Sequence, residues 1–143
     1  MHTAGQMIGF KGDELATLPS SATAFDAARL MTDCHIGSVV VVDDDGLVGI
    51  FTERDLMRRV VVEGRDAQAT SLEEVMTAQV AVATCDTSLD EVRNVMRSKR
   101  IRHLPVVEDG RAVGMVSLGD LNRAQHDIDV ETIHYLEQYI SVT

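Results

Sequence analysis

Two stretches of the chain decide the fold: residues 49–55, GIFTERD, and residues 114–120, GMVSLGD. They lie 65 positions apart, and the correspondence continues on both sides of them without a gap. The matched pairs include Met31 with Met96, Ile36 with Ile101, Val41-Val42 with Val106-Val107, Asp55-Leu56 with Asp120-Leu121, and Arg58 with Arg123. Two copies are too few for a solenoid, so the repeat predicts two similar units related by a pseudo-twofold axis.

Each unit shows the same order of expected elements. A helix with apolar residues at helical spacing begins after Thr23 in the first unit and after Ser88 in the second. A hairpin of two β-branched strands follows, over 38–43 and 47–52 in one unit and over 103–108 and 112–117 in the other. The turns, 44–46 and 109–111, both contain the Asp-Gly pair that favours a tight hairpin. A second helix is expected after each hairpin, near 53–62 and 119–124.

The expected fold is therefore α/β, with two β-α-β-β-α motifs packed on each other and a C-terminal amphipathic helix. We place the first motif at 8–62, a linker and short helix at 63–75, the second motif at 76–126 and the C-terminal helix at 128–141. Val130, Ile133, Leu136 and Ile140 form the apolar stripe of that last helix. The stripe covers either the core of this chain or the surface of a second copy.

Composition narrows the class of protein. The chain has 143 residues, 45% of them hydrophobic, and a net charge of −10, which argues against general nucleic-acid binding. No apolar run reaches the length of a membrane span and no secretory signal is visible, so a cytoplasmic protein is expected. Cys34 and Cys85 form no metal or disulfide pattern and are expected to be reduced.

The chemistry lies where each hairpin ends on a hydroxyl followed three residues later by a carboxylate, Thr52 with Asp55 and Ser117 with Asp120. One interpretation is a helix-capping box, which needs no ligand. The other is a ribose-phosphate site. Here the preceding glycine permits close approach, the helix N-terminus favours a phosphate and the carboxylate accepts hydrogen bonds from ribose hydroxyls. The same residues are compatible with both.

This phrase, twice present after a hairpin and an Ala- or Met-rich helix, resembles the signature of the cystathionine beta-synthase (CBS) domain family. Residues 101–107, IRHLPVV, and 36–40, IGSVV, are similar to the strand entry of that family. The resemblance covers roughly residues 8 to 126. It implies a stand-alone regulatory module that binds an adenosine-containing ligand.

The resemblance also implies roles for particular residues. Asp55 and Asp120 would bind ribose hydroxyls, while Thr52 and Ser117 would contact phosphate. Arg102 and His103 are further candidates for phosphate, although His103 could also be an ordinary strand-edge histidine. The residues expected around the adenine are Thr17, Val39, Val82, Leu104 and Pro105. Because Gly37 and Ser38 stand where the second unit has Arg102 and His103, the two clefts are expected to differ.

No catalytic pattern is present: the sequence has no metal-binding histidine spacing, no P-loop and no nucleophile elbow, so we expect no enzyme and no bound metal. The expected function is a sensor of AMP, ADP, ATP, NAD or S-adenosylmethionine that forms a homodimer and acts on a separate, unidentified effector protein. The alternative is an interaction or structural module whose clefts hold no ligand.

Overall fold

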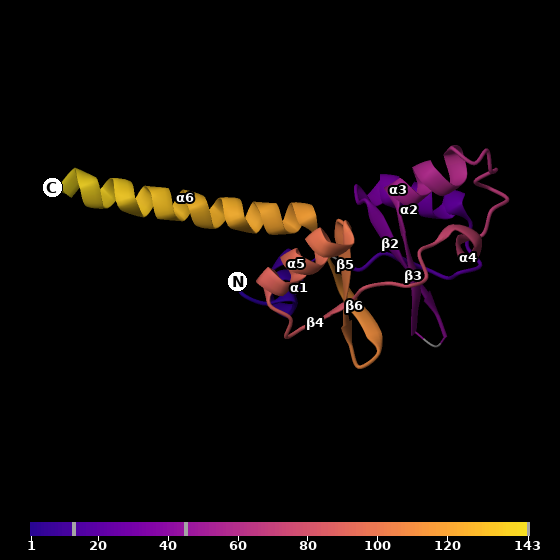
Figure 1. The fold of residues 1–143 in the computed structure, drawn as a ribbon, viewed down its shortest axis with the longest axis horizontal. Coiled ribbons are helices and arrows are strands. Elements are labelled where there is room, and N and C mark those ends of the chain that lie inside the picture. The colour runs from indigo at the N-terminus through magenta and orange to yellow at the C-terminus, as the bar shows by residue number, and fades with distance from the viewer. Residues whose placement is uncertain (13, 45, 143) are drawn as a thin grey trace.

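The structure, a computed structural model, describes residues 1–12, 14–44 and 46–142, with side chains as far as residue 138. Two α/β units lie side by side, and a long helix projects from the second (Figure 1). The first unit contains β1 (Thr17–Leu18), α2 (Ala24–Cys34), β2 (Ser38–Asp43), β3 (Gly46–Thr52), α3 (Glu53–Asp55) and a π-helical turn, η1 (Leu56–Val61). The second contains β4 (Ala83–Thr84), α5 (Leu89–Lys99), β5 (His103–Glu108), β6 (Arg111–Ser117) and α6 (Leu118–Val142). The expected α/β class is confirmed.

Each unit holds a three-stranded sheet with the same pairing. The short first strand runs parallel to the second, and the second and third form an antiparallel hairpin. Leu18 lies opposite Val41, and Ala83 lies opposite Val106, at equivalent positions of the repeat. Both hairpins carry a register shift directly after Val41 and Val106. The two copies therefore share their backbone geometry as well as their sequence.

The hairpins follow the predicted strands closely, with β3 and β6 each beginning one residue earlier than expected. In the second turn Asp109 and Gly110 both have positive φ, 52° and 79°, as a tight hairpin turn requires. In the first predicted turn, Asp45 lies outside the described residues.

Helices α2 and α5 begin at the predicted caps. The Thr23 hydroxyl accepts a hydrogen bond from the Asp26 N–H, and the Ser88 hydroxyl accepts one from the Glu91 N–H. Each helix is followed by a residue in the left-handed region that is not glycine, His35 with φ 55° and Arg100 with φ 56°. These two residues stand at equivalent positions, so both copies accept the same local strain.

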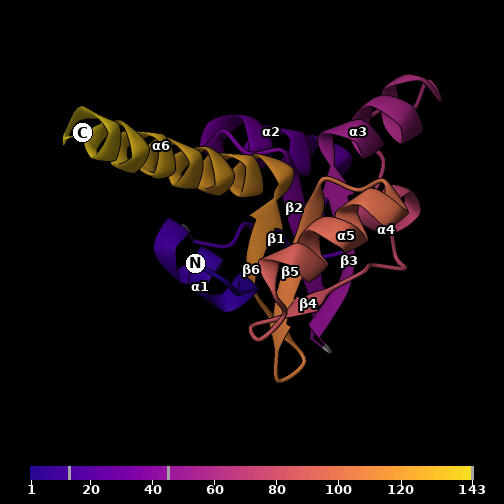
Figure 2. The same cartoon turned by 60° about the vertical axis from the view of Figure 1, so that its left-hand side comes forward.

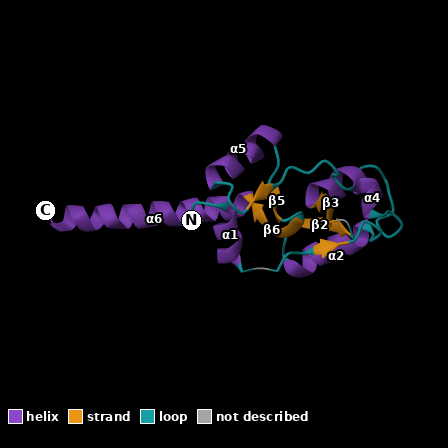
Figure 3. Cartoon of the chain, turned by 90° about the horizontal axis from the view of Figure 1, so that it is seen from below, coloured by secondary structure: helices purple, strands orange, loops and turns teal. Residues whose placement is uncertain are grey.

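Two short helices each pack against the unit that they do not directly precede in the sequence. Helix α1 (Ala4–Lys11) precedes the first unit but packs Met7 into the core of the second, and α4 (Leu72–Val75) precedes the second unit but packs Leu72 into the core of the first. The indigo α1 lies beside the second unit in Figures 1 and 2, and seen from below it flanks β5 and β6 on the side opposite α5 (Figure 3). The short helix at α4 was expected, whereas α1 was not.

The last helix differs from the prediction. Instead of one helix near 119–124 and another at 128–141, α6 is continuous over 25 residues. Its apolar side chains are 49–67% exposed at Ile128, Val130, Ile133, Tyr135 and Leu136. The described part of the stripe is therefore not covered by the core of this chain, and the Ile140 side chain lies outside the described part.

Candidate functional site

Two clefts lie between the units, and each is built from both. The Thr52 cleft, about 460 Å³, combines the start of α3 with residues 99–103 of the second unit. The Ser117 cleft, about 300 Å³, combines the start of α6 with residues 35–38 of the first unit. Thr52 and Asp55 thus share one cleft, Ser117 and Asp120 share the other, and His103 lines both.

The capping boxes predicted from the sequence are present in both clefts. The Asp55 N–H donates to Thr52 Oγ1 over 3.2 Å, and the Thr52 N–H donates to Asp55 Oδ2 over 3.0 Å. The equivalent bonds of Ser117 and Asp120 measure 3.0 and 2.9 Å. Each carboxylate therefore has one oxygen held by its own cap, and any ligand has to use the remaining hydrogen-bonding capacity.

The backbone at the helix start is less available to an anion than the sequence suggested. The N–H groups of Thr52 and Asp55 are bonded within the capping box, and the Glu53 N–H donates to the Gly37 carbonyl over 3.0 Å. The equivalent Leu118 N–H donates to the Arg102 carbonyl over 2.8 Å. A phosphate in either cleft must therefore be held mainly by side chains.

The residues expected around an adenine do not line either cleft. Val39, Leu104 and Pro105 are buried in the sheets, Val82 is exposed, and Thr17 lines a separate hollow beside the hairpin turns. Part of the apolar lining comes from neighbours of these residues in the sequence, Leu15, Ala16 and Ile36 in the Ser117 cleft and Val80, Ala81 and Ile101 in the Thr52 cleft; Ile8 and Met115 complete it in the Ser117 cleft and Ile50 in the Thr52 cleft. At the strand entries Ser38 and His103 line a cleft while the next residues, Val39 and Leu104, are buried, because successive side chains of a strand point to opposite faces.

The Thr52 cleft is strongly cationic. Its lining includes Glu53 and Asp55 as carboxylates, while the cationic side chains are Arg54, Arg58, Lys99, Arg100 and Arg102. Two basic stretches of the sequence, 54–59 and 99–103, therefore contribute to one cleft. An exception is Arg59, which donates to the carbonyls of Val75 and Met76 over 3.1 and 2.8 Å and so serves the fold. In an acidic chain this local excess of positive charge favours a phosphorylated ligand.

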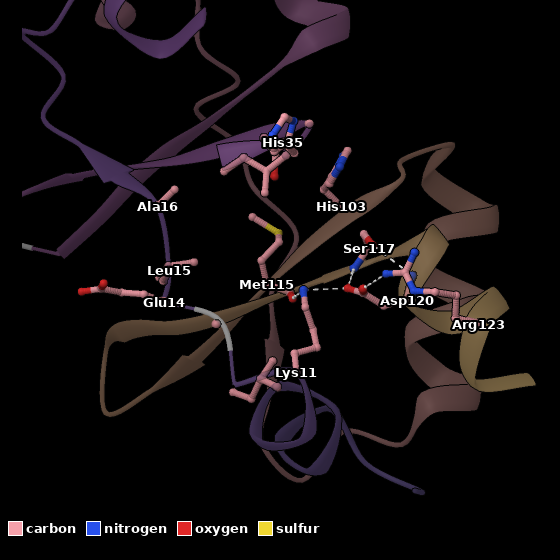
Figure 4. Close-up of a pocket in the computed structure, with 15 residues that line it drawn as sticks. Lys11, Glu14, Leu15, Ala16, His35, His103, Met115, Ser117, Asp120 and Arg123 are labelled. Atoms are coloured by element: carbon pink, nitrogen blue, oxygen red, sulfur yellow. Dashed lines mark hydrogen bonds and ion pairs between the residues drawn. The ribbon is translucent and has the colours of Figure 1, made fainter. Parts of the chain in front are cut away.

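The Ser117 cleft is balanced in charge and contains an ion pair. Lys11, the last residue of α1, places its Nζ 2.7 Å from Asp120 Oδ2 and 2.9 Å from the Met115 carbonyl oxygen (Figure 4). Arg123 pairs with the other carboxylate oxygen. Burial alone would raise the pKa of Asp120, but the bonds from Lys11 and Ser117 and the charge of Lys11 outweigh it, and the pKa is lowered. No sequence pattern placed Lys11 here.

His103 lies at the border between the clefts. Burial lowers its pKa, and the charges of Lys11 and Arg102 act in the same direction, while Glu53 and Asp120 oppose them. The imidazole is therefore neutral at pH 7 in the absence of a ligand. A Cβ on Gly37 would lie 3.3 Å from His103 Nε2 and 2.9 Å from Glu53 Oε1, so a side chain at this position would have to displace the ends of these two side chains.

The chain matches the model of the CBS domain twice, over residues 12–62 and 72–127. It is 37% identical over 123 residues to the mitochondrial CBS domain-containing protein CBSX3 of Arabidopsis thaliana, covering 82% of this chain and 60% of that protein. It is 36% identical over 108 residues to the CBS domain-containing protein YhcV of Bacillus subtilis, covering 76% of each. The chain therefore spans less than two thirds of the plant relative and about three quarters of the bacterial one.

Solved structures agree with this assignment. A putative signal-transduction protein with CBS domains from Burkholderia ambifaria superposes with a TM-score of 0.80 at 38% identity, covering 85% of this chain and 92% of that one. The CBS domain pair of protein MJ0100, solved with 5-methylthioadenosine and S-adenosyl-L-methionine, has a TM-score of 0.78 at 27% identity, covering 87% and 96%. A hexameric CBS-CP12 protein from bloom-forming cyanobacteria has a TM-score of 0.74 at 25% identity, covering 83% and 68%.

These matches and the two-cleft architecture define a pair of CBS domains. The chain belongs to the CBS-domain family.

Two further observations bear on the class of protein. Among the described residues no helix is both long enough and apolar enough to cross a membrane. In the same part of the chain no three His, Cys, Asp or Glu side chains converge as ligands of a metal ion. Among the relatives named above, the Burkholderia ambifaria protein is described as a putative signal-transduction protein, and the family model that matches is that of the CBS domain.

Proposed function

We propose that this protein binds an adenosine-containing nucleotide in the Thr52 cleft and regulates a separate partner protein according to its occupancy. The observation that carries the proposal is the pairing of the Thr52–Asp55 motif with a cluster of cationic side chains in one open cleft. The solved CBS pair that holds 5-methylthioadenosine and S-adenosyl-L-methionine supports an adenosine-containing ligand.

Each part of the cleft has a task in this proposal. Asp55 Oδ1, which is 3.7 Å from Arg59 Nε, accepts the ribose hydroxyls, since Oδ2 is held by the cap. Arg100 and Arg102 reach the phosphates, and Ala81 and Ile101 provide apolar contact to the base. AMP, ADP, ATP, NAD and S-adenosylmethionine all carry the adenosine that this arrangement recognises.

Thermal unfolding with each of these five compounds tests the proposal. A ligand that binds the folded state alone stabilises it by RT ln(1 + [L]/Kd), about 2.7 kcal/mol at a hundredfold excess over Kd. We expect at least one of them to raise the Tm in a dose-dependent way. If none does at millimolar concentration, the nucleotide function is refuted.

The chain contains a matched control for the role of Asp55. Asp26 makes the same pair of capping bonds with Thr23, 3.0 and 3.0 Å, but lies outside both clefts. Asp55→Ala and Asp26→Ala each remove one of the two bonds of a capping box and leave the threonine cap in place, and each should cost about 1 kcal/mol of stability. Only Asp55→Ala should also weaken the ligand-induced rise in Tm, by about tenfold in Kd.

A second candidate function is an interaction module without a ligand. The closed capping boxes favour it, because Thr52, Asp55, Ser117 and Asp120 all have partners within the chain. In that case the two alanine variants at positions 26 and 55 would behave alike and no nucleotide would shift the Tm.

Self-association is part of the proposal. The exposed stripe of α6 is apolar, and a second copy of the chain is the occupant we propose for it, in a protein acting in the cytoplasm. The hexameric CBS-CP12 structure supports assembly of such pairs. Light scattering should show at least a dimer that Ile133→Glu with Leu136→Glu converts to a monomer; a monomeric parent protein would refute this part alone.

A further inference from the structure

The two clefts differ most in one side chain contributed by the preceding helix. At the repeat spacing, Lys11 of α1 corresponds to Met76, which directly follows α4. Lys11 extends into the Ser117 cleft, whereas Met76 packs over Gly49, whose Cβ would lie 2.5 Å from the Met76 sulfur. Met76 does not line the Thr52 cleft.

This difference determines how accessible each carboxylate is. Asp120 Oδ2 accepts bonds from both the Ser117 N–H and Lys11 Nζ, Oδ1 is paired with Arg123, and the side chain is 4% exposed. Asp55 has only its cap and Arg59 at 3.7 Å, and its side chain is 13% exposed. A ribose would find one oxygen open at Asp55 and both oxygens occupied at Asp120.

Arg123 and Lys11 are not equivalent obstacles. The Arg123 side chain is 72% exposed, so solvent can replace its contact with Asp120, and its counterpart Arg58 also lines a cleft. Lys11 is 22% exposed, is anchored by the Met115 carbonyl as well, and belongs to a helix whose Met7 is buried in the core. Displacing Lys11 therefore breaks two bonds to a charged group at once, while α1 holds its backbone in place.

We propose that Lys11 is a built-in competitor for the ribose at Asp120, so that the chain binds one nucleotide, in the Thr52 cleft, and keeps the Ser117 cleft closed. This rests on the nucleotide function proposed above. The Lys11 ammonium takes the position that a ribose hydroxyl would occupy as a donor to Asp120. The resulting ion pair neutralises the carboxylate and leaves no oxygen of Asp120 for the two ribose hydroxyls. Lys11 is thus the residue that sets the number of nucleotides per chain.

Isothermal titration calorimetry of the full chain tests this, with AMP and ATP as probes. The parent protein should bind one nucleotide per chain, through a site that Asp55→Ala weakens and Asp120→Ala does not. Lys11→Met copies the side chain of the other cleft and should reveal a second site, with affinity raised about tenfold or more by the loss of a charged hydrogen bond. Adding Asp120→Ala to Lys11→Met should abolish that second site.

Lys11→Arg is the matched control, because it retains a cation that can pair with Asp120; one nucleotide should still bind. Urea denaturation of each variant verifies that it is folded, and a Lys11→Gln variant provides a second neutral substitution if Lys11→Met is unstable. Two equal sites in the parent protein, or a single site in both Lys11→Met and Lys11→Gln, would overturn the competitor role and leave the nucleotide function standing. Absence of binding in every variant would overturn both.

Discussion

The Thr52 cleft and the Ser117 cleft are built from equivalent strands and equivalent capping boxes. In each, the first helical N–H donates to a carbonyl just before the second strand of the same unit. The side chains that the two clefts present to a ligand nevertheless differ. One is cationic and has Oδ1 of Asp55 only in a 3.7 Å contact with Arg59, while the other is balanced in charge and holds Asp120 in ion pairs with Lys11 and Arg123. Both copies of the repeat keep the backbone that forms the cleft, and both keep the two capping residues. The flanking residues, which the backbone does not constrain, decide what each cleft does.

The largest expected effect comes from making the Thr52 cleft less cationic. Arg100→Ala with Arg102→Ala should weaken ATP binding by about a hundredfold, since each charge-assisted hydrogen bond is worth roughly a factor of ten. Adenosine, which lacks phosphates, should lose much less. Calorimetry at two salt concentrations measures both, and Arg97→Ala, in the last turn of α5 just before these residues but outside the cleft, is the control. Equal losses for ATP and adenosine would contradict phosphate contact.

A smaller difference is expected in stability. Asp120→Ala leaves the partly buried Lys11 ammonium without its carboxylate partner and should cost about 2 kcal/mol, compared with about 1 kcal/mol for the capping-box bond lost in Asp55→Ala. Urea denaturation gives both values. Lys11→Met in the Asp120→Ala background should recover part of the loss, and a lack of any coupling between the two positions would argue against a structural ion pair.

The next smaller effect is the dependence of folding stability on pH, which His103 is expected to cause. The pKa of His103 is lowered in the folded protein, so the unfolded chain binds a proton at this imidazole more tightly than the folded chain does. The stability that the neutral imidazole contributes is therefore lost as the pH falls below its ordinary pKa of 6.5. The lowered pKa of Asp120 adds a further loss only below 3.8. His103→Ser, which copies Ser38, should therefore reduce the change in stability between pH 7 and 5.5, as followed by thermal melts. An unchanged slope would show that His103 is not buried as a neutral group.

The smallest effect concerns the strained helix ends. His35→Gly and Arg100→Gly should each stabilise the fold by up to about 1 kcal/mol, because glycine accepts the left-handed conformation without strain. The two changes should match in thermal melts but differ in binding, since only Arg100→Gly removes a cation from the Thr52 cleft. Opposite effects on stability would mean that the side chains make compensating contacts.

Much of the fold could be predicted from the sequence, because the hairpins and the caps at Thr23 and Ser88 are signalled by local patterns that occur twice. Helix α1 was missed although Thr3 and Gln6 form a capping box, because its apolar partners are in the second unit, far along the chain. The break expected in α6 is absent, since no glycine or proline lies between Ala124 and Val130 to interrupt it.

The candidate site could be predicted only in part. The Thr52–Asp55 and Ser117–Asp120 pairs follow from the repeat and do reach the clefts. The apolar residues that line the clefts could not be assigned, because several of them, such as Ala16 and Ala81, lie in loops just before a strand, where no periodic pattern marks the side that faces the cleft. The contact of Lys11 with Asp120 joins residues 109 positions apart and depends on α1 packing across to the other unit.

The exchange of α1 and α4 between the units also has a consequence for synthesis. Helix α1 is translated before both units, but its buried side chains belong to a core whose other members extend from Ala83 to Leu121. It must remain without its packing partners until most of the chain has been made, while the first unit needs only α4 to complete its own core. The first unit should therefore fold while the ribosome is still making the second, and α1 should dock last. On that order Lys11 reaches Asp120 in the final step of folding.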